Sequence, residues 1–208
     1  MQCEDVTGLV LAGGRGSRMG GLDKGLQSLH GQALALHCAR RLAPQVGALA
    51  INANRHHPQY ASWSWPVWSD GPASGSFPGP LAGFMAGLTH CQTPLLCTVA
   101  CDSPFFPLDL VERLYNCLQE ADADIAMAAA FEGGEDLMRP QPVFCLLKVE
   151  LRERLQAFMQ SGGRKIDAWT AGERTVLARF DRPGDDRRAF LNINTLQQLD
   201  QLEQESAS

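Results

Sequence analysis

The sequence predicts an α/β protein in which a mostly parallel sheet lies between two layers of helices. Short apolar runs of strand length alternate with longer stretches in which apolar residues recur at helical spacing. The short runs lack the in–out alternation of half-exposed strands, which indicates a sheet covered by helices on both faces. A length of 208 residues suits one sizeable domain, and we expect the whole chain, residues 1–208, to form it.

Each strand is predicted from an apolar run. The strands expected in chain order are Val6–Leu11, Ala48–Ala53, the short Val67–Trp68, Leu95–Ala100, Asp124–Ala130, Val143–Leu147 and Phe190–Ile193.

Each helix is predicted from apolar residues three and four positions apart. In Leu108–Glu120 they form one stripe, and the preceding Pro107 is favoured in a first helical turn. The polar tail Glu203–Ser208 is expected to fray. The other expected helices are Leu34–Leu42, Leu81–His90, Glu150–Gln160 and Thr195 to about Leu202.

The net charge of -5 argues against general nucleic-acid binding, which needs an excess of Lys and Arg. Any phosphate site must therefore be a local basic pocket. The best candidate is LAGGRGSRMGGLDKG, residues 11–25, which follows the first expected strand. It combines six glycines with Arg15, Arg18 and Lys24.

The seven cysteines are scattered and include no CxxC pair, so their spacing favours free thiols over a structural zinc site. Reduced thiols favour the cytoplasm. The first residues are acidic where a secretory signal is basic, and no apolar run approaches the ~20 residues of a membrane span. We therefore expect a soluble cytoplasmic protein without a membrane partner.

The glycine-rich loop departs from two common phosphate-binding patterns. A P-loop requires GxxxxGK followed by Ser or Thr, but Lys24 is followed by Gly25. The dinucleotide pattern GxGxxG starts at Gly14 but reaches Met19 at its third glycine position, and the second expected strand contains no acid for a ribose. A third arrangement fits: bare backbone N–H groups approach a phosphate, and Arg18 and Lys24 add charge-assisted bonds.

The loop resembles the pattern LAGGxxxRMGGxDKG of molybdenum cofactor guanylyltransferases. Four further segments resemble that family's motifs in the same order along nearly the whole chain: Asn52–His56 (NANRH), Pro78–Gly83 (PGPLAG), Cys101–Pro104 (CDSP) and Phe190–Thr195 (FLNINT). Asp70 resembles the acid that ends the family's third strand. The chain departs from the pattern at Ala100, where Pro is expected, and in Gly71–Phe77, which looks expanded.

The resemblance implies a Rossmann-like domain that binds nucleotide in residues 1–110 or so and the acceptor in about 111–200. It implies transfer of GMP from GTP to the molybdopterin form of the molybdenum cofactor, with Mg²⁺ and release of pyrophosphate. Transient contact with proteins that donate the cofactor and with recipient molybdoenzymes would follow. The LAGG form of the loop resembles guanylyl enzymes, whereas LAAG accompanies cytidylyl transfer.

The resemblance also assigns site residues. Asp102, Arg18 and Lys24 are expected to be catalytic, with Asp102 as the Mg²⁺ ligand. The residues expected to bind nucleotide or cofactor are Leu11, Ala12, Gly13, Gly14, Gly16, Arg18, Lys24, Asn52, Asp70, Gly79, Asp102 and Asn194.

Several of these residues have a second interpretation. Asp102 also suits a turn residue before Pro104. Asp70 can accept the two adjacent N–H donors of guanine or bind a ribose, or it can begin the turn at Gly71. Asn52 presents an amide to the nucleotide or is an ordinary polar strand end.

Other polar and aromatic residues are less specific. His56 and His57 are interpreted as solvated residues that open a helix. Trp63, Trp65 and Trp68 are expected to pack along an edge strand, with stacking on a pterin as the alternative. Arg164 and Lys165 are either a phosphate contact for the acceptor or a solvated helix end, and Arg139–Pro142 would border the acceptor site.

Two alternative functions share these features. A nucleotidyltransferase that uses CTP or another phosphorylated acceptor would keep the loop and Asp102. A non-catalytic nucleotide or cofactor carrier would not require both Lys24 and Asp102.

Overall fold

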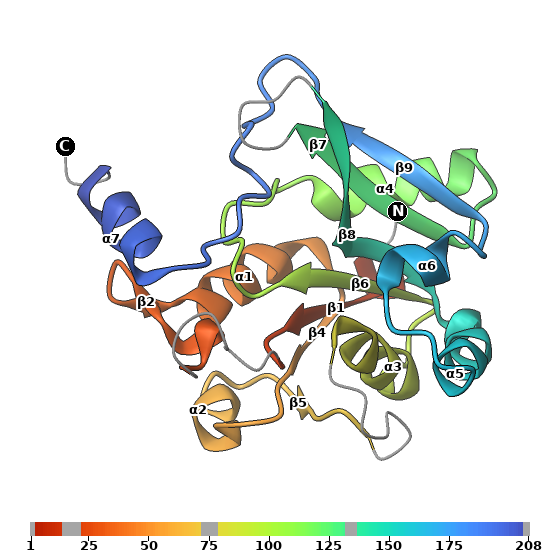
Figure 1. The fold of residues 1–208 in the computed structure, drawn as a ribbon, viewed down its shortest axis with the longest axis horizontal. Helices are drawn as coiled ribbons and strands as arrows, with labels where there is room; N and C mark the ends of the chain where they lie inside the picture. Colours follow the sequence, from red (N-terminus) through yellow and green to blue (C-terminus); the bar gives the residue numbers. More distant parts are fainter. Residues whose placement is uncertain (1–2, 14–21, 72–78, 132–136, 206–208) are drawn as a thin grey trace.

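A seven-stranded sheet with the order β5-β4-β1-β6-β8-β7-β9 forms the centre of the protein (Figure 1). The computed structural model describes residues 3–13, 22–71, 79–131 and 137–205. The strands of this sheet are β1 (Val6–Leu11), β4 (Ala48–Asn52), β5 (Val67–Trp68), β6 (Leu95–Ala100), β7 (Ile125–Phe131), β8 (Met138–Lys148) and β9 (Thr175–Phe180), and β2 (Ser28–Leu29) and β3 (Gln32–Ala33) form a separate hairpin.

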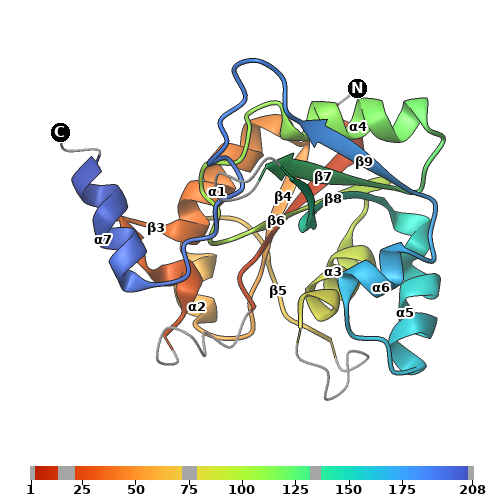
Figure 2. The same cartoon turned by 45° about the horizontal axis from the view of Figure 1, so that its top comes forward.

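Helices lie on both faces of the sheet (Figure 2). They are α1 (Leu34–Leu42), α2 (His57–Ala61), α3 (Pro80–His90), α4 (Leu110–Glu120), α5 (Arg152–Gln160), α6 (Ile166–Thr170) and α7 (Leu196–Glu205). The apolar sides of α1 and α4 share one buried cluster with the sheet, and α3, α5 and α6 share a second cluster on the opposite face. The three-layer architecture expected from the sequence is confirmed.

The first half of the sheet is parallel. Within it β1 pairs with β4 on one side and β6 on the other, and β4 pairs with β5. Both β1 and β6 are buried along most of their length, because helices cover each face. Because these strands are parallel, their carboxyl ends lie along one edge of the sheet.

The second half contains the antiparallel exception. β8 pairs antiparallel with both β6 and β7, whereas β7 and β9 are parallel. β8 is longer than the predicted Val143–Leu147, because it begins at Met138 and includes two prolines. Those prolines lie in the part of β8 that pairs with β7 beside an irregularity in register, where a missing N–H is tolerated.

The prediction of a strand at Phe190–Ile193 is wrong. Phe190 is buried with ring contacts to Phe144 and Phe180, at centroid distances of 5.0 and 5.1 Å. The backbone N–H of Ile193 donates to the carbonyl of Asp102, which lies in a loop rather than a strand. The apolar residues of Phe190–Ile193 thus pack onto the core, and the segment does not pair with the sheet.

The C-terminal helix also extends further than predicted. α7 continues to Glu205, so residues 203–205 are helical, and residues 206–208 lie outside the described part of the chain. The Glu203 side chain accepts a 2.9 Å hydrogen bond from the backbone N–H of His30, in the β2–β3 hairpin. This bond and the burial of Leu199 with Leu29 and Leu34 hold α7 against the protein. Within the described ranges, the structure holds no helix of the length and apolar character that a bilayer crossing requires.

A cluster of charged side chains lies at the amino end of β7. Asp124 accepts two hydrogen bonds from Arg174, at 2.7 and 3.0 Å, and one from Lys148 at 3.1 Å. The bonds from Arg174, followed by that from Lys148, lower the pKa of the Asp124 carboxyl from its ordinary 3.8 to about 2. These contacts join the ends of three strands.

Asp124 should make the unfolding free energy dependent on acid. Because its folded-state pKa is depressed, its stabilisation is present above about pH 4 and is lost as the pH falls toward 2. In D124N the fall of the unfolding free energy over that window should be smaller by on the order of 1 kcal/mol, a modest value because Arg174 is mostly exposed. Urea unfolding at steps of pH measures it, with the exposed Asp200→Asn as control. An unchanged pH dependence in D124N would contradict the assignment.

Candidate active site

Three strand ends bring predicted site residues together at one edge of the sheet. The register aligns Leu11 at the end of β1 with Asn52 of β4 on one side and Ala100 of β6 on the other. Gly13 lies two residues after the end of β1, and Asp102 lies two residues after the end of β6. In open α/β sheets, ligands bind at the carboxyl ends of the strands, at the point where the strand order reverses.

Lys24 connects two of these residues. Its ammonium group forms an ion pair with the Asp102 carboxylate and donates a 2.8 Å hydrogen bond to Asn194 Oδ1. The side chains of Lys24 and Asp102 are 22% and 16% exposed, so the pair is accessible from solvent but not surrounded by it. A cation, a carboxylate and an amide from three distant parts of the sequence therefore converge.

Asn194 is held at this position by the loop that follows Phe190. Ile193 N donates to Asp102 O at 2.8 Å, and Ser103 Oγ donates to Asn192 Oδ1 at 2.7 Å. The backbone N–H of Asn194 donates to Gln198 at the start of α7. The sequence motifs pointed to Asn194 but not to the pair of Ser103 and Asn192. Ser103 belongs to the CDSP motif and Asn192 to the FLNINT motif, and the two residues are 89 positions apart in the sequence.

A second group surrounds Asp70, which follows β5. Asp70 Oδ1 accepts from Asn52 Nδ2 at 2.9 Å, and Oδ2 accepts from Asn54 Nδ2 at 2.7 Å. The backbone N–H of Asp70 donates to Asn54 Oδ1 at 2.9 Å. Asn54, which sequence reasoning did not single out, thus belongs to the same network as the predicted Asn52 and Asp70.

Gly13 lies in contact with this network. A Cβ atom at position 13 would lie 2.8 Å from Asn54 Nδ2 and 2.9 Å from Asn52 Oδ1, closer than real side chains approach. A side chain at position 13 would therefore force the two amides out of their present positions, whereas glycine lets the backbone approach them.

The remaining predicted site residues lie at other points of the same edge or outside the described chain. Leu11 and Ala12 end β1 and begin its loop, with Ala12 N donating to Asn52 O at 2.8 Å. Gly79 directly precedes α3. The predicted residues Gly14, Gly16 and Arg18 lie outside the described residues.

The chain matches one protein family over most of its length. The family sequence model described as "MobA-like NTP transferase domain" matches residues 8–177. The chain belongs to the MobA-like NTP transferase family. The family resemblance drawn from the motifs is confirmed.

Relatives within this family cover nearly all of the chain. A protein named "Molybdenum cofactor guanylyltransferase" from Albidiferax ferrireducens is 58% identical over 209 residues, covering 98% of both chains. One of the same name from Bordetella petrii is 57% identical and covers 95% of this chain and 97% of its own.

Solved structures with low sequence identity share the fold of this chain. "Molybdopterin-guanine dinucleotide biosynthesis protein A" from Archaeoglobus fulgidus superimposes with a TM-score of 0.75 at 22% identity, covering 97% of this chain and 98% of its own. A "4-diphosphocytidyl-2C-methyl-D-erythritolsynthase" from Anaerococcus prevotii gives 0.72 at 9% identity and full coverage of both. At these identities the likeness shows the shared fold alone.

The cysteines of this MobA-like chain are free thiols, and four of them are buried. Burial raises the pKa of the Cys97 thiol to about 12 and the pKa of Cys101 well above its ordinary value, the nearby Asp102 adding to the shift. Cys101 therefore stays a neutral thiol beside the site, unlike the thiolate that a nucleophilic cysteine requires.

The aromatic and histidine interpretations hold in part. Trp68 lies in the edge strand β5, and Trp63 and Trp65 pack partly buried against the core, as the packing interpretation expects. His56 is exposed just before α2, and His57 Nε2 lies 3.0 Å from Ser69 Oγ.

The two basic segments predicted near an acceptor differ in setting. Arg164 Nη1 donates to the carbonyls of Met159 and Gly163, at 3.1 and 2.6 Å, which is the role of a cation at a helix end. Lys165 is exposed at the start of α6. Arg139–Pro142 lies within β8 rather than before it.

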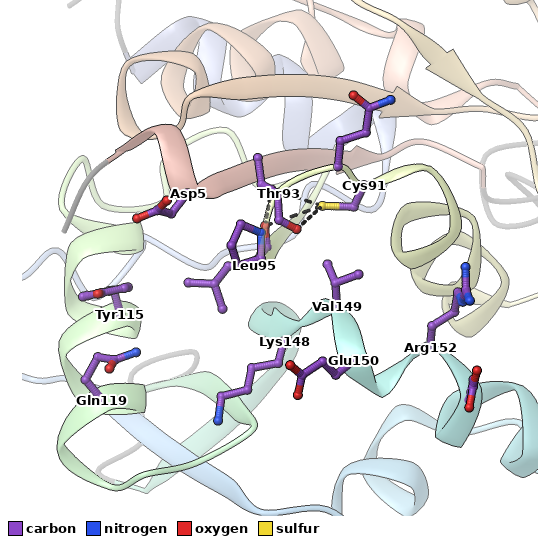
Figure 3. Close-up of a pocket in the computed structure, with 13 residues that line it drawn as sticks. Asp5, Cys91, Thr93, Leu95, Tyr115, Gln119, Lys148, Val149, Glu150 and Arg152 are labelled. Carbon is purple, nitrogen blue, oxygen red and sulfur yellow. Dashed lines mark hydrogen bonds between the residues drawn. The ribbon is translucent and has the colours of Figure 1, made fainter.

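A hollow of about 810 Å³ lies at the other end of the strands (Figure 3). It is lined by Leu95 at the start of β6, Tyr115 of α4 and Lys148 at the end of β8, and by none of the predicted site residues. Two of its lining side chains bond to each other: Thr93 Oγ1 lies 3.2 Å from Cys91 Sγ, and it also donates to Leu95 O at 2.9 Å. The converging residues at the carboxyl edge are therefore the stronger candidate site.

The amide network should contribute to stability through Asp70. D70A removes the acceptor of Asn52 Nδ2, a buried side chain that would keep only the carbonyl of Trp68 as partner. We expect a loss of about 1 kcal/mol of unfolding free energy, the usual net value of a hydrogen bond of this kind. Urea unfolding measures it, and the exposed Asp200→Ala is the control. Equal stability of the two variants would contradict a network of this strength.

Proposed function

We propose that this chain transfers GMP from GTP to the molybdopterin form of the molybdenum cofactor and releases pyrophosphate. The observation that carries the proposal is the convergence of Lys24, Asp102 and Asn194 at the carboxyl edge of the sheet, in a chain whose relatives are named for this activity. The terminal phosphate of the acceptor attacks the α-phosphorus of GTP. A new P–O–P linkage forms, the bond to the β-phosphate breaks, and pyrophosphate leaves.

The reaction needs little proton transfer from the protein. The acceptor phosphate is already ionised and is the nucleophile, so no covalent enzyme intermediate is required. The buried neutral thiol of Cys101 agrees with this scheme. Catalysis is then positioning and charge neutralisation by preorganised groups.

Lys24 is proposed to neutralise charge on the departing pyrophosphate. Its ammonium group carries a full charge, already lies at the strand edge, and is aimed by Asp102 and Asn194. Arg18, from its place in the glycine-rich loop of the sequence, is proposed to add a second cation. Both would make charge-assisted bonds to phosphate oxygens.

Asp102 is proposed to hold Mg²⁺. Mg²⁺ needs only one or two protein carboxylates and completes its coordination with water and substrate phosphates. One half-buried carboxylate at the strand edge fits this demand, and the described residues contain no group of three or more His, Cys, Asp or Glu side chains placed to hold a metal. When bound, the ion would offset negative charge on the reacting phosphates.

The Asp70 network is proposed to bind the nucleoside. Each carboxylate oxygen can accept more than one hydrogen bond, so Asp70 can hold Asn52 and Asn54 and still accept the adjacent N–H donors of guanine. Asn52 and Gly13 would then line the nucleoside site next to Asp70. Leu11, Ala12, Gly14, Gly16 and Gly79 are proposed to line the nucleotide.

The cellular setting follows from the same chemistry. We propose that the chain works in the cytoplasm, where its free thiols stay reduced, and contacts cofactor-donating proteins and recipient molybdoenzymes transiently.

The base preference tests the proposal for Asp70. We expect GTP to be used in preference to CTP by roughly 5- to 150-fold, because a mismatched base leaves a buried polar group unpaired at ~1–3 kcal/mol. The assay mixes protein, Mg²⁺ and molybdopterin cofactor with each triphosphate and with both in competition. Equal or faster turnover of CTP would reject the guanine assignment, and transfer only to a different phosphorylated acceptor would reject molybdopterin.

Asp102→Asn separates catalysis from binding. The variant keeps the size of the side chain but removes the charge that Mg²⁺ needs, so transfer should slow by on the order of 10²–10⁴ while GTP affinity falls modestly. Single-turnover formation of the dinucleotide cofactor measures the first, and calorimetry with GTP measures the second. Near wild-type transfer would return Asp102 to the role of a turn residue. Binding of GTP without transfer by the wild-type protein would favour the carrier alternative.

A further inference from the structure

We propose that Tyr60 is a positioning residue for Lys24, acting through a buried hydrogen bond to Asp23. The role of Lys24 toward GTP rests on the proposed function, whereas the link from Tyr60 to Asp23 stands on the structure itself.

The Asp23 carboxylate serves the interior of the protein. Asp23 is only 7% exposed, and its Oδ1 accepts from Tyr60 OH at 2.7 Å and from Gly25 N at 3.1 Å. Its backbone carbonyl accepts from Gln27 Nε2 at 2.9 Å. In the motif DKG the acid next to Lys24 thus holds the backbone rather than a ligand.

These bonds fix the turn from which Lys24 extends. Lys24–Leu26 is a single 3₁₀ turn, and Asp23 caps its start through the bond from Gly25 N. Such a cap satisfies a backbone donor that the turn itself leaves unpaired. Tyr60 ties the cap to α2, 37 positions away in the sequence. The neighbouring Lys24 then reaches the Asp102 carboxylate and Asn194 from a fixed backbone.

The backbone at Gly25 lies too close to Tyr60 for a side chain at position 25. A Cβ atom at position 25 would lie 2.5 Å from Tyr60 OH, 3.2 Å from the Cβ of Ala35 and 3.3 Å from the Cβ of Ala12. The turn is therefore packed directly on the tyrosine hydroxyl and on the start of the loop after β1.

Tyr60 is itself immobilised. It is fully buried, and its ring meets that of Trp63 edge-on at 5.2 Å. Burial and the bond to Asp23 raise the pKa of the Tyr60 hydroxyl, so it stays a donor at neutral pH. A rigid aromatic ring thus carries the hydrogen bond that orients the lysine turn.

The main test is the affinity for GTP with Mg²⁺, measured by calorimetry on the full chain. Y60F keeps the ring and removes the bond to Asp23, and we expect affinity to fall about 3- to 10-fold, a part of what a lost bond to a charged group costs. Y115F removes the same hydroxyl from a tyrosine beside the hollow at the other strand ends and should bind GTP like wild type. Equal affinities of Y60F and Y115F would overturn the proposal.

Two variants of Asp23 separate hydrogen bonding from charge. D23N keeps an acceptor oxygen and a good capping residue, so affinity should fall about 2-fold, whereas D23A loses both bonds and should fall about 10-fold or more. Equal losses in D23N and D23A would mean that the charge itself acts on the ligand, and would overturn the proposal.

A double-mutant cycle with Lys24→Met distinguishes positioning from general destabilisation. K24M alone should weaken GTP binding roughly 10- to 150-fold, as for a bond to a charged group. If Tyr60 acts through the lysine, Y60F has no further effect in the K24M background. The same Y60F loss in both backgrounds would assign Tyr60 a structural role alone and overturn the proposal.

Hydrogen exchange decides the structural link without any nucleotide. In Y60F a peptide covering residues 23–27 should exchange faster than in wild type and Y115F, because the Gly25 amide loses its ordered acceptor. Unchanged exchange would overturn the proposal. Failure of the wild-type protein to bind GTP would instead count against the proposed function, and the exchange result would still decide the link from Tyr60 to the turn.

Discussion

One cation held between two acceptors organises the carboxyl edge of this protein. Lys24 contacts the Asp102 carboxylate and the Asn194 amide, and each of the three arrives from a different part of the chain. A charge at a half-buried site is tolerable only when partners compensate for lost water. The two contacts of Lys24 therefore constrain three loops at once, and the neighbouring contacts hold those loops in place.

The two halves of the sheet contribute differently to this arrangement. The parallel half supplies Asn52, the last residue of β4, and the strand ends that Gly13 and Asp102 follow. The half around β7, β8 and β9 anchors the chain that carries Asn194: buried Arg113 bonds to Asp185 at 2.8 and 3.0 Å and lies over the Phe180 ring at 4.0 Å. The mixed sheet is thus what brings the C-terminal segment back to the first loop.

The sequence was most informative where local pattern decides structure. β1, β6 and α1 have the predicted bounds, because their apolar runs need only a buried position and the right period. Phe190–Ile193 has the same apolar character but forms no strand, since its backbone finds partners in the loop at Asp102. Composition cannot tell docking onto a core from pairing in a sheet.

The candidate site was predictable as a set of residues but not as a set of contacts. Motifs named Lys24, Asp70 and Asn194, yet nothing local reveals that Asp23 faces Tyr60 or that Asn54 shares Asp70 with Asn52. Such pairings depend on how loops pack after the sheet has formed. The sequence alone does not show that Asp23 is buried against a tyrosine whereas Asp102 is accessible from solvent.

The span of the Lys24 contacts also bears on how the molecule folds. The bond to Asn194 closes a loop of 170 positions, whereas the β7–β8 pair joins strands that are near neighbours in sequence. Closing a long loop loses more chain entropy before any contact compensates for it, so distant contacts tend to form late. A folding chain would then complete most of its sheet while Lys24 still lacks one partner. Segments with few buried contacts also open most easily, so the polar junction at Asn194 would separate before the core melts.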